Sequence, residues 1–197
     1  MTKDYHIDFT NLNFDYLNGT RFQSVYDSLN TAKKLYNIDK NSCCSKLRYA
    51  LEIIIDEILS ICERANDKRT TINSNLNLLR ECIPESLRKY NNEDIIIEMH
   101  NVRRYGNDGT HYDDKKDVDI DKVTYTSWIA MKKICKWIST FESKYREYKA
   151  DENTRLKRKA EENRKKVNGI ISTIFKLVLF IIGIIIAILT GKRINKL

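Results

Sequence analysis

The sequence is poor in the two residues that interrupt helices, with one proline and six glycines among 197 residues. Proline removes a backbone donor and glycine has the largest conformational freedom to lose, so their scarcity leaves long stretches able to form helices. No run alternates between apolar and polar residues for long enough to predict a sheet. Together with many Lys, Glu, Ile and Leu residues, these absences predict an all-α fold.

The cysteines lack the spacing of a metal site or a disulfide scaffold. They are odd in number and include no CxxC pair: Cys43, Cys44, Cys62, Cys82 and Cys135. Zinc requires pairs of ligands at short spacing, and the three histidines do not supply them. We therefore predict no structural metal and no cofactor. We expect buried free thiols in a reducing compartment, with the adjacent Cys43 and Cys44 serving mainly in packing.

The excess of positive charge belongs to the last quarter of the chain. The net charge of +8 divides into +7 for residues 151–197 and +1 for residues 1–150. A basic cluster beside an apolar segment is explained by anionic lipid headgroups, which contribute about 1 kcal/mol per Lys or Arg near the surface. The global charge is therefore no evidence for binding of RNA or DNA.

Residues 169–191, GIISTIFKLVLFIIGIIIAILTG, are the clearest physical signal. At about 1.5 Å per helical residue they are long enough to cross a hydrocarbon layer of about 30 Å. Their one charge, Lys176, lies close enough to the basic side to extend toward the headgroups. The alternative of a buried core helix is disfavoured by thirteen consecutive apolar residues from Leu177 to Leu189. We expect residues 169–191 to bind the membrane as a single span.

The flanks of this segment predict its orientation. Seven Lys and Arg residues lie in 151–168, whereas residues 192–197 carry three, which places the N-terminal part in the cytoplasm. The polar start MTKDYHIDF has no apolar core of a signal peptide, so we expect a C-terminal anchor. The predicted organisation is an N-terminal segment (1–19), a helical domain (20–148), a basic linker (149–168), the span (169–191) and a short tail (192–197).

Five amphipathic stretches are expected in the helical domain. Apolar residues at spacings of three and four predict helices over about 21–36, 45–65, 70–83, 92–104 and 121–149. The second is expected to be the central helix, because Leu47, Leu51, Ile54 and Ile58 line one face. Pro84 is expected in the first turn of a further short helix. A bundle of about five helices followed by the span is the predicted architecture.

The stretch RRYGNDGTH, residues 103–111, follows the fourth predicted helix and admits two interpretations. In the first, Gly106 ends the helix with a left-handed cap and residues 107–109 form a turn. In the second, Arg103, Arg104, Asn107 and His111 converge on one phosphate, because arginine is a permanent cationic donor and histidine exchanges a proton near neutral pH. His100, on the same predicted helix, could face this site, but it lies outside the motif pattern and is expected to be a surface or core residue.

This stretch resembles the signature of the HEPN superfamily (higher eukaryote and prokaryote nucleotide-binding), in particular the branch called domain of unknown function 4145. The branch shows an Arg, two residues, Gly-Asn, three residues and His, matched here from Arg103 to His111. LRYALE at 47–52 resembles the core helix of the branch, and IPESL at 83–87 resembles the break before its motif helix. The resemblance covers about residues 20–148 and implies the HEPN helical bundle.

The resemblance also implies a chemistry and a partner. Many HEPN proteins are metal-independent ribonucleases of toxin or antiphage-defence systems, with sites completed across a homodimer. In these proteins four to six residues separate the Arg from the His; Arg104 has six residues before His111, and Arg103 has seven. The resemblance therefore assigns His111 as general acid or base and an arginine as the group that stabilises the phosphorane. Six aspartates crowd the motif with negative charge and would repel an RNA backbone unless they cap the following helix or face away: Asp108, Asp113, Asp114, Asp117, Asp119 and Asp121.

Three functions remain open from the sequence. The first is a membrane-anchored ribonuclease that uses Arg104 and His111 in a homodimer. The second is a non-catalytic HEPN module that binds a nucleotide, nucleic acid or protein at the membrane. The third makes the apolar segment itself the effector, which disrupts the bilayer. Replacement of His111 by Ala is expected to abolish only the first activity, and deletion of residues 169–197 only the third.

Overall fold

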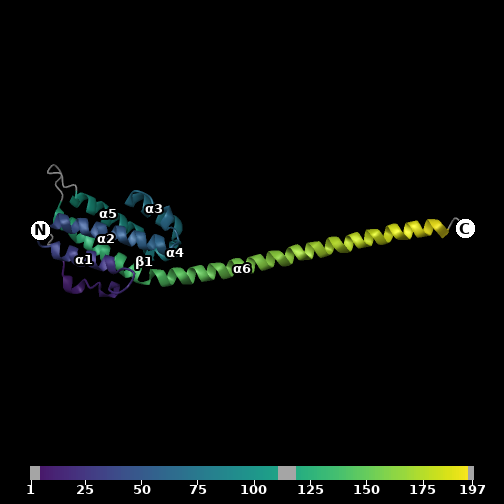
Figure 1. The fold of residues 1–197 in the computed structure, drawn as a ribbon, viewed down its shortest axis with the longest axis horizontal. Coiled ribbons are helices and arrows are strands. Elements are labelled where there is room, and N and C mark those ends of the chain that lie inside the picture. The colour runs from purple at the N-terminus through teal and green to yellow at the C-terminus, as the bar shows by residue number, and fades with distance from the viewer. Residues whose placement is uncertain (1–4, 111–118, 195–197) are drawn as a thin grey trace. The chain divides into compact units, whose positions relative to one another are not determined.

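The computed structural model describes residues 5–110 and 119–194 and divides the chain into two units, Met1–Arg146 and Glu147–Leu197. The protein is mostly helical, as its composition predicted (Figure 1). The helices are α1 (Gln23–Leu35), α2 (Lys40–Ile61), α3 (Ile72–Cys82), α4 (Glu85–Arg88), α5 (Ile95–Thr110) and α6 (Ile120–Ile194). Short 3₁₀ turns lie at Phe9–Asn11, Asp15–Leu17 and Ala65–Asp67.

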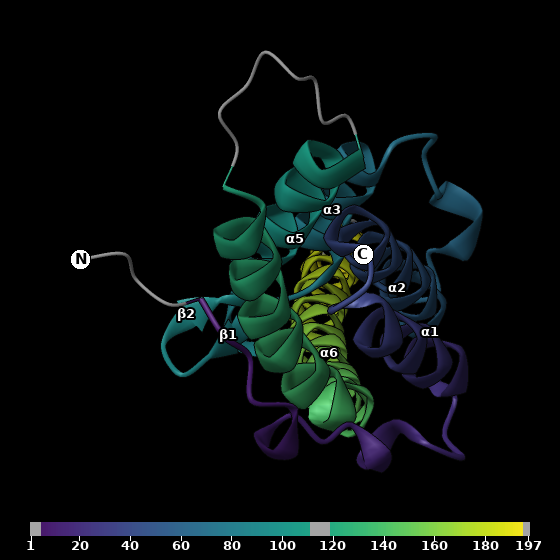
Figure 2. The same ribbon diagram turned by 90° about the vertical axis from the view of Figure 1, so that its left-hand side faces the viewer.

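Helix α2 is the centre of the first unit, as predicted. It begins at Lys40, earlier than the predicted residue 45, because Asp39 caps it: its Oδ1 accepts from the backbone N–H of Asn41 at 3.0 Å and of Ser42 at 3.1 Å. Its predicted apolar face is fully buried at Leu47, Leu51, Ile54 and Ile58. Helices α1 and α5 pack against it on either side (Figure 1), and α3 contacts both α2 and α5 (Figure 2).

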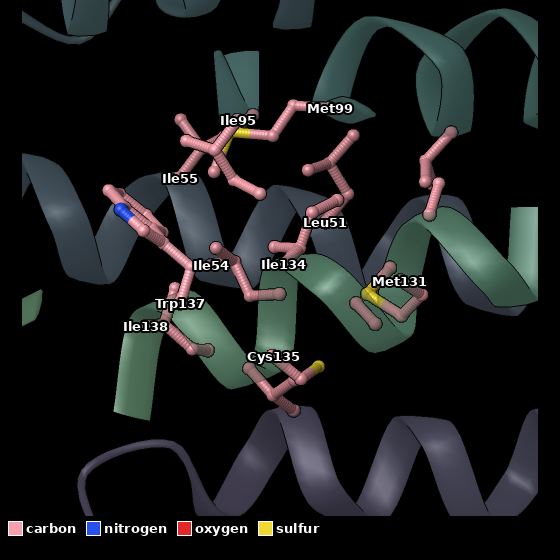
Figure 3. Close-up of a cluster of buried hydrophobic side chains, with 14 of the residues drawn as sticks. Leu51, Ile54, Ile55, Ile95, Met99, Met131, Ile134, Cys135, Trp137 and Ile138 are labelled. Atoms are coloured by element: carbon pink, nitrogen blue, oxygen red, sulfur yellow. The ribbon is translucent and has the colours of Figure 1, made fainter. Parts of the chain in front are cut away.

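The first part of α6 completes the core from the other side. Asp119 caps this helix, with its Oδ1 accepting from the N–H of Lys122 at 3.0 Å, which is one of the two placements by which an aspartate near the motif would avoid repelling RNA. The apolar stripe predicted for this helix is buried at Trp128, Met131, Cys135, Ile138, Phe141 and Tyr145. Figure 3 shows Met131, Cys135 and Ile138 of this stripe in one cluster with side chains of α2 and α5, labelled Leu51, Ile54, Ile55, Ile95 and Met99.

The described part of the N-terminal segment packs on the same core. Ile7, Leu12, Phe14 and Leu17 are buried. Phe9 stands edge-on to Trp128, with ring centroids 5.2 Å apart. Aromatic pairs of this geometry add to the stability that area burial provides. This segment is therefore part of the first unit's core.

A short hairpin joins α4 to α5 and was not predicted. Strands β1 (Lys89–Tyr90) and β2 (Glu93–Asp94) pair antiparallel, with Tyr90 opposite Glu93. The two turn residues, Asn91 and Asn92, have φ values of 52° and 65°. Asparagine tolerates this left-handed region, which tight hairpin turns require. Strands of two residues are too short to show a period-two pattern, so no pattern in the chain predicts them.

The second unit consists of the later part of α6. The segments 149–168 and 169–191, predicted as linker and span, belong to one continuous helix with the stretch that precedes them. Their described side chains are mostly exposed, including Phe175, Phe180 and Leu189 at 61 to 67% of their full accessibility. The apolar part is long and apolar enough to cross a membrane by length and composition.

Candidate functional site

The stretch that begins at Arg103 is helical through Thr110. Helix α5 passes through Gly106 without a break, and the glycine given a left-handed φ among the described residues is Gly19, at 70°. The prediction that Gly106 is a left-handed cap followed by a turn at 107–109 is therefore wrong. His111, the fourth predicted site residue, lies outside the described residues.

Gly106 is required by helix packing. It is buried, and a Cβ at this position would lie 2.6 Å from Cβ of Arg48 in α2. A glycine within a helix costs about 1 kcal/mol relative to alanine, so its presence here reflects the close approach of α5 to α2. In a sequence, a glycine after an amphipathic run is equally consistent with a left-handed helix cap and with a close contact between helices, because both favour a residue without a Cβ. The sequence alone therefore favoured the wrong interpretation.

Because α5 continues, three of the predicted site residues share one side of a helix. Arg103, Arg104 and Asn107 follow His100 at spacings of three, four and seven, which places all four along one stripe. His100, Arg103 and Asn107 are half-buried, and Arg104 is exposed. The other side of α5 carries the buried residues Ile95, Met99 and Val102.

His100 is surrounded by positive charge. Burial is the main cause that lowers the pKa of its imidazole below the ordinary value, and the charges of Arg103, Arg80 and Arg104 lower it further; Asp94 acts in the opposite direction. The imidazole is therefore neutral at pH 7. Arg80 comes from α3, so two helices contribute to this surface. We call the set Arg80, His100, Arg103 and Arg104 the cation cluster.

The arginines of the cation cluster lack carboxylate partners. None of the three forms an ion pair with a residue in the described part of the chain. The Nε of Arg103 is buried and has no hydrogen-bond partner among those residues. Arg104 donates from Nη2 to Asn101 at 3.0 Å and lies 5.2 Å from the ring centre of Tyr105. The cluster therefore carries positive charge that the described protein does not neutralise.

Several cations elsewhere on the first unit pair with carboxylates. Lys133 of α6 donates to Glu93 at 2.7 Å and to Glu98 at 2.6 Å, on another face of α5. In the cleft between α2 and the start of α3, Lys68 pairs with Asp56 at 2.7 Å. Arg48 and Arg69, which line the same cleft, lie 3.7 Å from Glu52 and 3.6 Å from Glu81 respectively. This contrast makes the cation cluster the stronger candidate for binding an external anion.

The cation cluster has the chemistry of a phosphate site. Arginine donates two hydrogen bonds in a planar fork that matches phosphate oxygens, and a neutral imidazole accepts a proton. Within the described residues, no group of three His, Cys, Asp or Glu side chains is placed to hold a metal ion. The residues on this surface therefore favour an anionic ligand rather than a cation.

One member of the cluster was missed by the sequence reasoning, and another was set aside. His100 was considered as a residue that could face the site, but a surface or core role was preferred because it lies outside the motif pattern. Its spacing of three, four and seven to the predicted residues places it on their stripe once α5 continues through Gly106. Arg80 left no sequence signal, because it reaches the surface from α3, a different helix. Proximity between helices depends on how they pack, which spacing along the chain does not encode.

Comparison with known proteins returned no match to a protein family, a curated protein or a solved structure.

Proposed function

We propose that this chain is a membrane-anchored, HEPN-like RNA-binding protein that cleaves RNA without a metal ion. The observation that carries the proposal is the cation cluster, in which three arginines form no ion pair with the described residues and their charges lower the pKa of His100. Phosphate contacts from arginine supply most of the affinity of proteins for nucleic acids. A bound phosphate would also give the buried Nε of Arg103 a hydrogen-bond acceptor.

The arrangement of the three segments that resemble HEPN proteins supports the proposal. Arg48 of LRYALE lies against Gly106 of the motif helix, at a distance that only glycine permits. The carbonyl of Leu87 in IPESL accepts a hydrogen bond from Nε1 of Trp137 at 2.8 Å. The three segments that resemble one family thus each contact a helix of the same bundle.

The proposed reaction is an internal transesterification, in which phosphorus exchanges its bond to the 5′-oxygen for a bond to the ribose 2′-oxygen. The ribose 2′-hydroxyl attacks the adjacent phosphorus and gives up its proton to a base, while the 5′-oxygen leaves and receives a proton from an acid. The products are a 2′,3′-cyclic phosphate and a 5′-hydroxyl. In the HEPN-like proposal His111 is the acid or base and Arg104 stabilises the charge of the phosphorane. A homodimer would bring a second copy of both residues to the site.

The second unit supports the membrane part of the proposal. The described large apolar side chains of residues 170–189 are 44 to 67% exposed. Three consecutive cations, Arg164, Lys165 and Lys166, precede this run and match the cytoplasmic, anionic side of a bilayer. We infer that residues 169–191 anchor the chain and that the first unit acts in the cytoplasm.

A second function, binding of RNA without cleavage, is favoured by one observation. Within the described residues, the cation cluster contains a single group able to exchange a proton near pH 7, which is His100. Cleavage needs both an acid and a base, whereas binding needs only the arginines. The two functions therefore differ in whether His111 contributes to chemistry.

The experiment is incubation of the full chain, in nanodiscs of neutral lipid, with single-stranded RNA in the presence of a metal chelator. We expect fragments that end in 2′,3′-cyclic phosphate. His111→Ala and Arg104→Gln should each lower the cleavage rate by about a hundredfold or more, the typical contribution of one catalytic group. Lys34→Gln, which removes the same charge on an exposed position of α1, should leave the rate unchanged.

The outcomes separate the two functions. If the wild-type protein binds RNA but does not cleave it, and His111→Ala binds RNA with the same affinity, the chain binds RNA without cleaving it. If cleavage requires a metal ion, or survives both substitutions, the proposed ribonuclease is wrong.

A further inference from the structure

The cleft between α2 and the start of α3 has a volume of about 400 Å³. Ligand pockets in proteins typically enclose about 300–1,000 Å³. The cleft is lined by the apolar side chains of Ile53 and Ile72, by Tyr49, and by polar side chains that include Arg48 and Glu52. It therefore suits a chemical group that is apolar on its faces and forms hydrogen bonds at its edge.

A buried amide holds one wall of the cleft in place. Asn75 is 5% exposed, and its Oδ1 accepts a hydrogen bond from the backbone N–H of Arg69 at 2.7 Å. Its Nδ2 donates to the carbonyl of the same residue at 3.0 Å. Both hydrogen-bonding groups of the amide are thus satisfied, and they fix the backbone that leads into α3. The cleft is therefore formed before any ligand binds.

Arg48 and Glu52 offer a donor and an acceptor side by side in the cleft. The Nε of Arg48 lies 3.7 Å from Oε1 of Glu52, which is too far for a hydrogen bond. This Nε is buried and has no hydrogen-bond partner among the described residues. The two side chains carry opposite charges, so the pair adds no net charge. A neutral ligand with an acceptor next to a donor matches this pair better than a phosphate does.

Tyr49 adds an accessible aromatic ring to the cleft. The side chain is 51% exposed, and the Nζ of Lys46 lies 5.4 Å from its ring centre. Unstacked bases of single-stranded RNA stack on aromatic side chains of this kind and form hydrogen bonds through their edges. A nucleobase is flat and carries donors and acceptors on its edge, so it fits both the ring and the Arg48–Glu52 pair.

Arg48 also connects the cleft to the cation cluster. Its Cβ and Cδ lie 2.6 and 3.1 Å from the position that a Cβ of Gly106 would occupy, so this side chain lies against α5. Gly106 follows Arg103 by three residues, which is about 4.5 Å along a helix axis. One side of the cleft therefore lies within a helical turn of an arginine of the cation cluster.

We propose that this cleft is a base-binding subsite, which holds one unpaired nucleobase of an RNA whose phosphates contact the cation cluster. The base stacks on Tyr49, its faces contact Ile53 and Ile72, and its edge accepts from Arg48 and donates to Glu52. The inference rests on the proposed binding of RNA. It adds a substrate class to that proposal, namely single-stranded RNA, because the bases of a duplex are paired and stacked and do not enter a cleft.

The test is equilibrium binding of two single-stranded oligoribonucleotides of equal length to the full chain in nanodiscs of neutral lipid. One strand is fully abasic, so the two have the same phosphates. We expect the wild type to bind the abasic strand at least tenfold more weakly. Tyr49→Ala should lower the affinity for the strand with bases about tenfold and leave that for the abasic strand unchanged. Ile38→Ala, which removes another exposed apolar side chain, should change neither affinity.

The outcomes separate this inference from the proposed function. Equal affinity of the wild type for the two strands would overturn the base-binding subsite and leave the proposed binding of RNA phosphates in place. Binding of neither strand would overturn both. A preference for bases that Tyr49→Ala retains in full would place the base elsewhere and would overturn the subsite. The comparison of strands uses the wild-type chain, so it decides whether bases contribute even if a variant folds poorly.

Discussion

The two units of this chain expose the same apolar residue types in opposite ways. In the first unit Leu47, Leu51, Ile54 and Ile58 are fully buried in a core that helices α1, α2, α5 and α6 share. In the second unit Ile182 is 46% exposed and Phe180 is 67% exposed on the later part of α6. The first unit therefore buries its apolar side chains in its own core, whereas those of the second unit need an apolar environment outside the protein, which we infer is lipid.

Charge follows the same division. Residues 1–150 have a net charge of +1, whereas residues 151–197 have +7. Within the first unit, a local excess of positive charge is therefore more informative than the total charge. The cation cluster has such an excess. The second unit's charges match a membrane surface, and those of the cation cluster match a phosphate.

The largest expected effect is loss of membrane association when the chain is ended after Asn168. Thirteen consecutive apolar residues contribute on the order of 20 kcal/mol when they move from water into hydrocarbon. The full chain should therefore remain in the membrane fraction after alkaline carbonate extraction, and the shortened chain should be released. A full chain that carbonate releases would contradict the inferred span.

A matched pair of truncations tests the contrast between the units directly. Leu51→Ala should lower the free energy of unfolding of the first unit by about 3–5 kcal/mol, because it leaves a cavity in a closed core. Ile182→Ala should leave that free energy unchanged. Both tryptophans, Trp128 and Trp137, lie in the first unit, so their fluorescence during urea unfolding reports on it alone. Equal destabilisation by the two variants would show that residue 182 packs on the first unit.

Gly106→Ala should destabilise the first unit by about 1–3 kcal/mol, since the new Cβ would lie 2.6 Å from Cβ of Arg48. Gly183→Ala is the control, because no heavy atom lies within 4 Å of a Cβ built there. The same urea unfolding measurement applies. A stabilised Gly106→Ala protein would mean that helix propensity outweighs the contact and that α5 and α2 are less closely packed.

The helices themselves could be predicted from the sequence, and the reason lies in residues such as Leu51 and Thr71. Apolar residues at spacings of three and four marked the buried faces, and the Thr71 side chain caps α3, accepting from the N–H of Ser74 at 3.1 Å. The path of α5 through Gly106 could not be predicted. Its cause is a contact with Arg48, nearly sixty residues away, and long-range packing leaves no local pattern.

The candidate site was predicted in part for the same reason. Arg103, Arg104 and Asn107 do lie on one stripe of α5, which local spacing determines once the helix is known to continue. The addition of Arg80 depends on the packing of α3 beside α5, and the neutral state of His100 depends on burial. The place of His111 falls outside the described residues, so its role stays a prediction.

The smallest expected effect is a pH dependence of RNA binding through His100. Burial and three arginines lower the pKa of its imidazole below 6.5 in the free protein. A bound phosphate adds negative charge and raises this pKa, so binding takes up a proton. Affinity should therefore increase a few-fold as the pH falls from about 7.5 to about 5.5. His100→Gln should remove this dependence, and an unchanged profile in that variant would exclude His100 from the binding surface.

The same depressed pKa has a consequence for stability, with the opposite trend. The unfolded chain binds a proton at His100 below about pH 6.5, whereas the folded chain does so only at lower pH. The free energy of unfolding should therefore fall as the pH decreases from about 6.5 through the folded pKa. His100→Gln should reduce this loss in urea unfolding measured over the same range, and an identical loss in the variant would assign it to other groups.

The central claim is that the unneutralised arginines of the cation cluster bind RNA phosphates. The most direct test is equilibrium binding of labelled single-stranded RNA to the full chain in neutral nanodiscs, measured at several salt concentrations for Arg103→Gln and Lys34→Gln. Both variants lose one charge and keep the basic residues of the second unit. We expect the affinity of Arg103→Gln for RNA to be about tenfold lower than that of the wild type, with a shallower salt dependence. We expect Lys34→Gln to bind RNA as the wild type does. Equal affinities of the two variants would contradict the central claim.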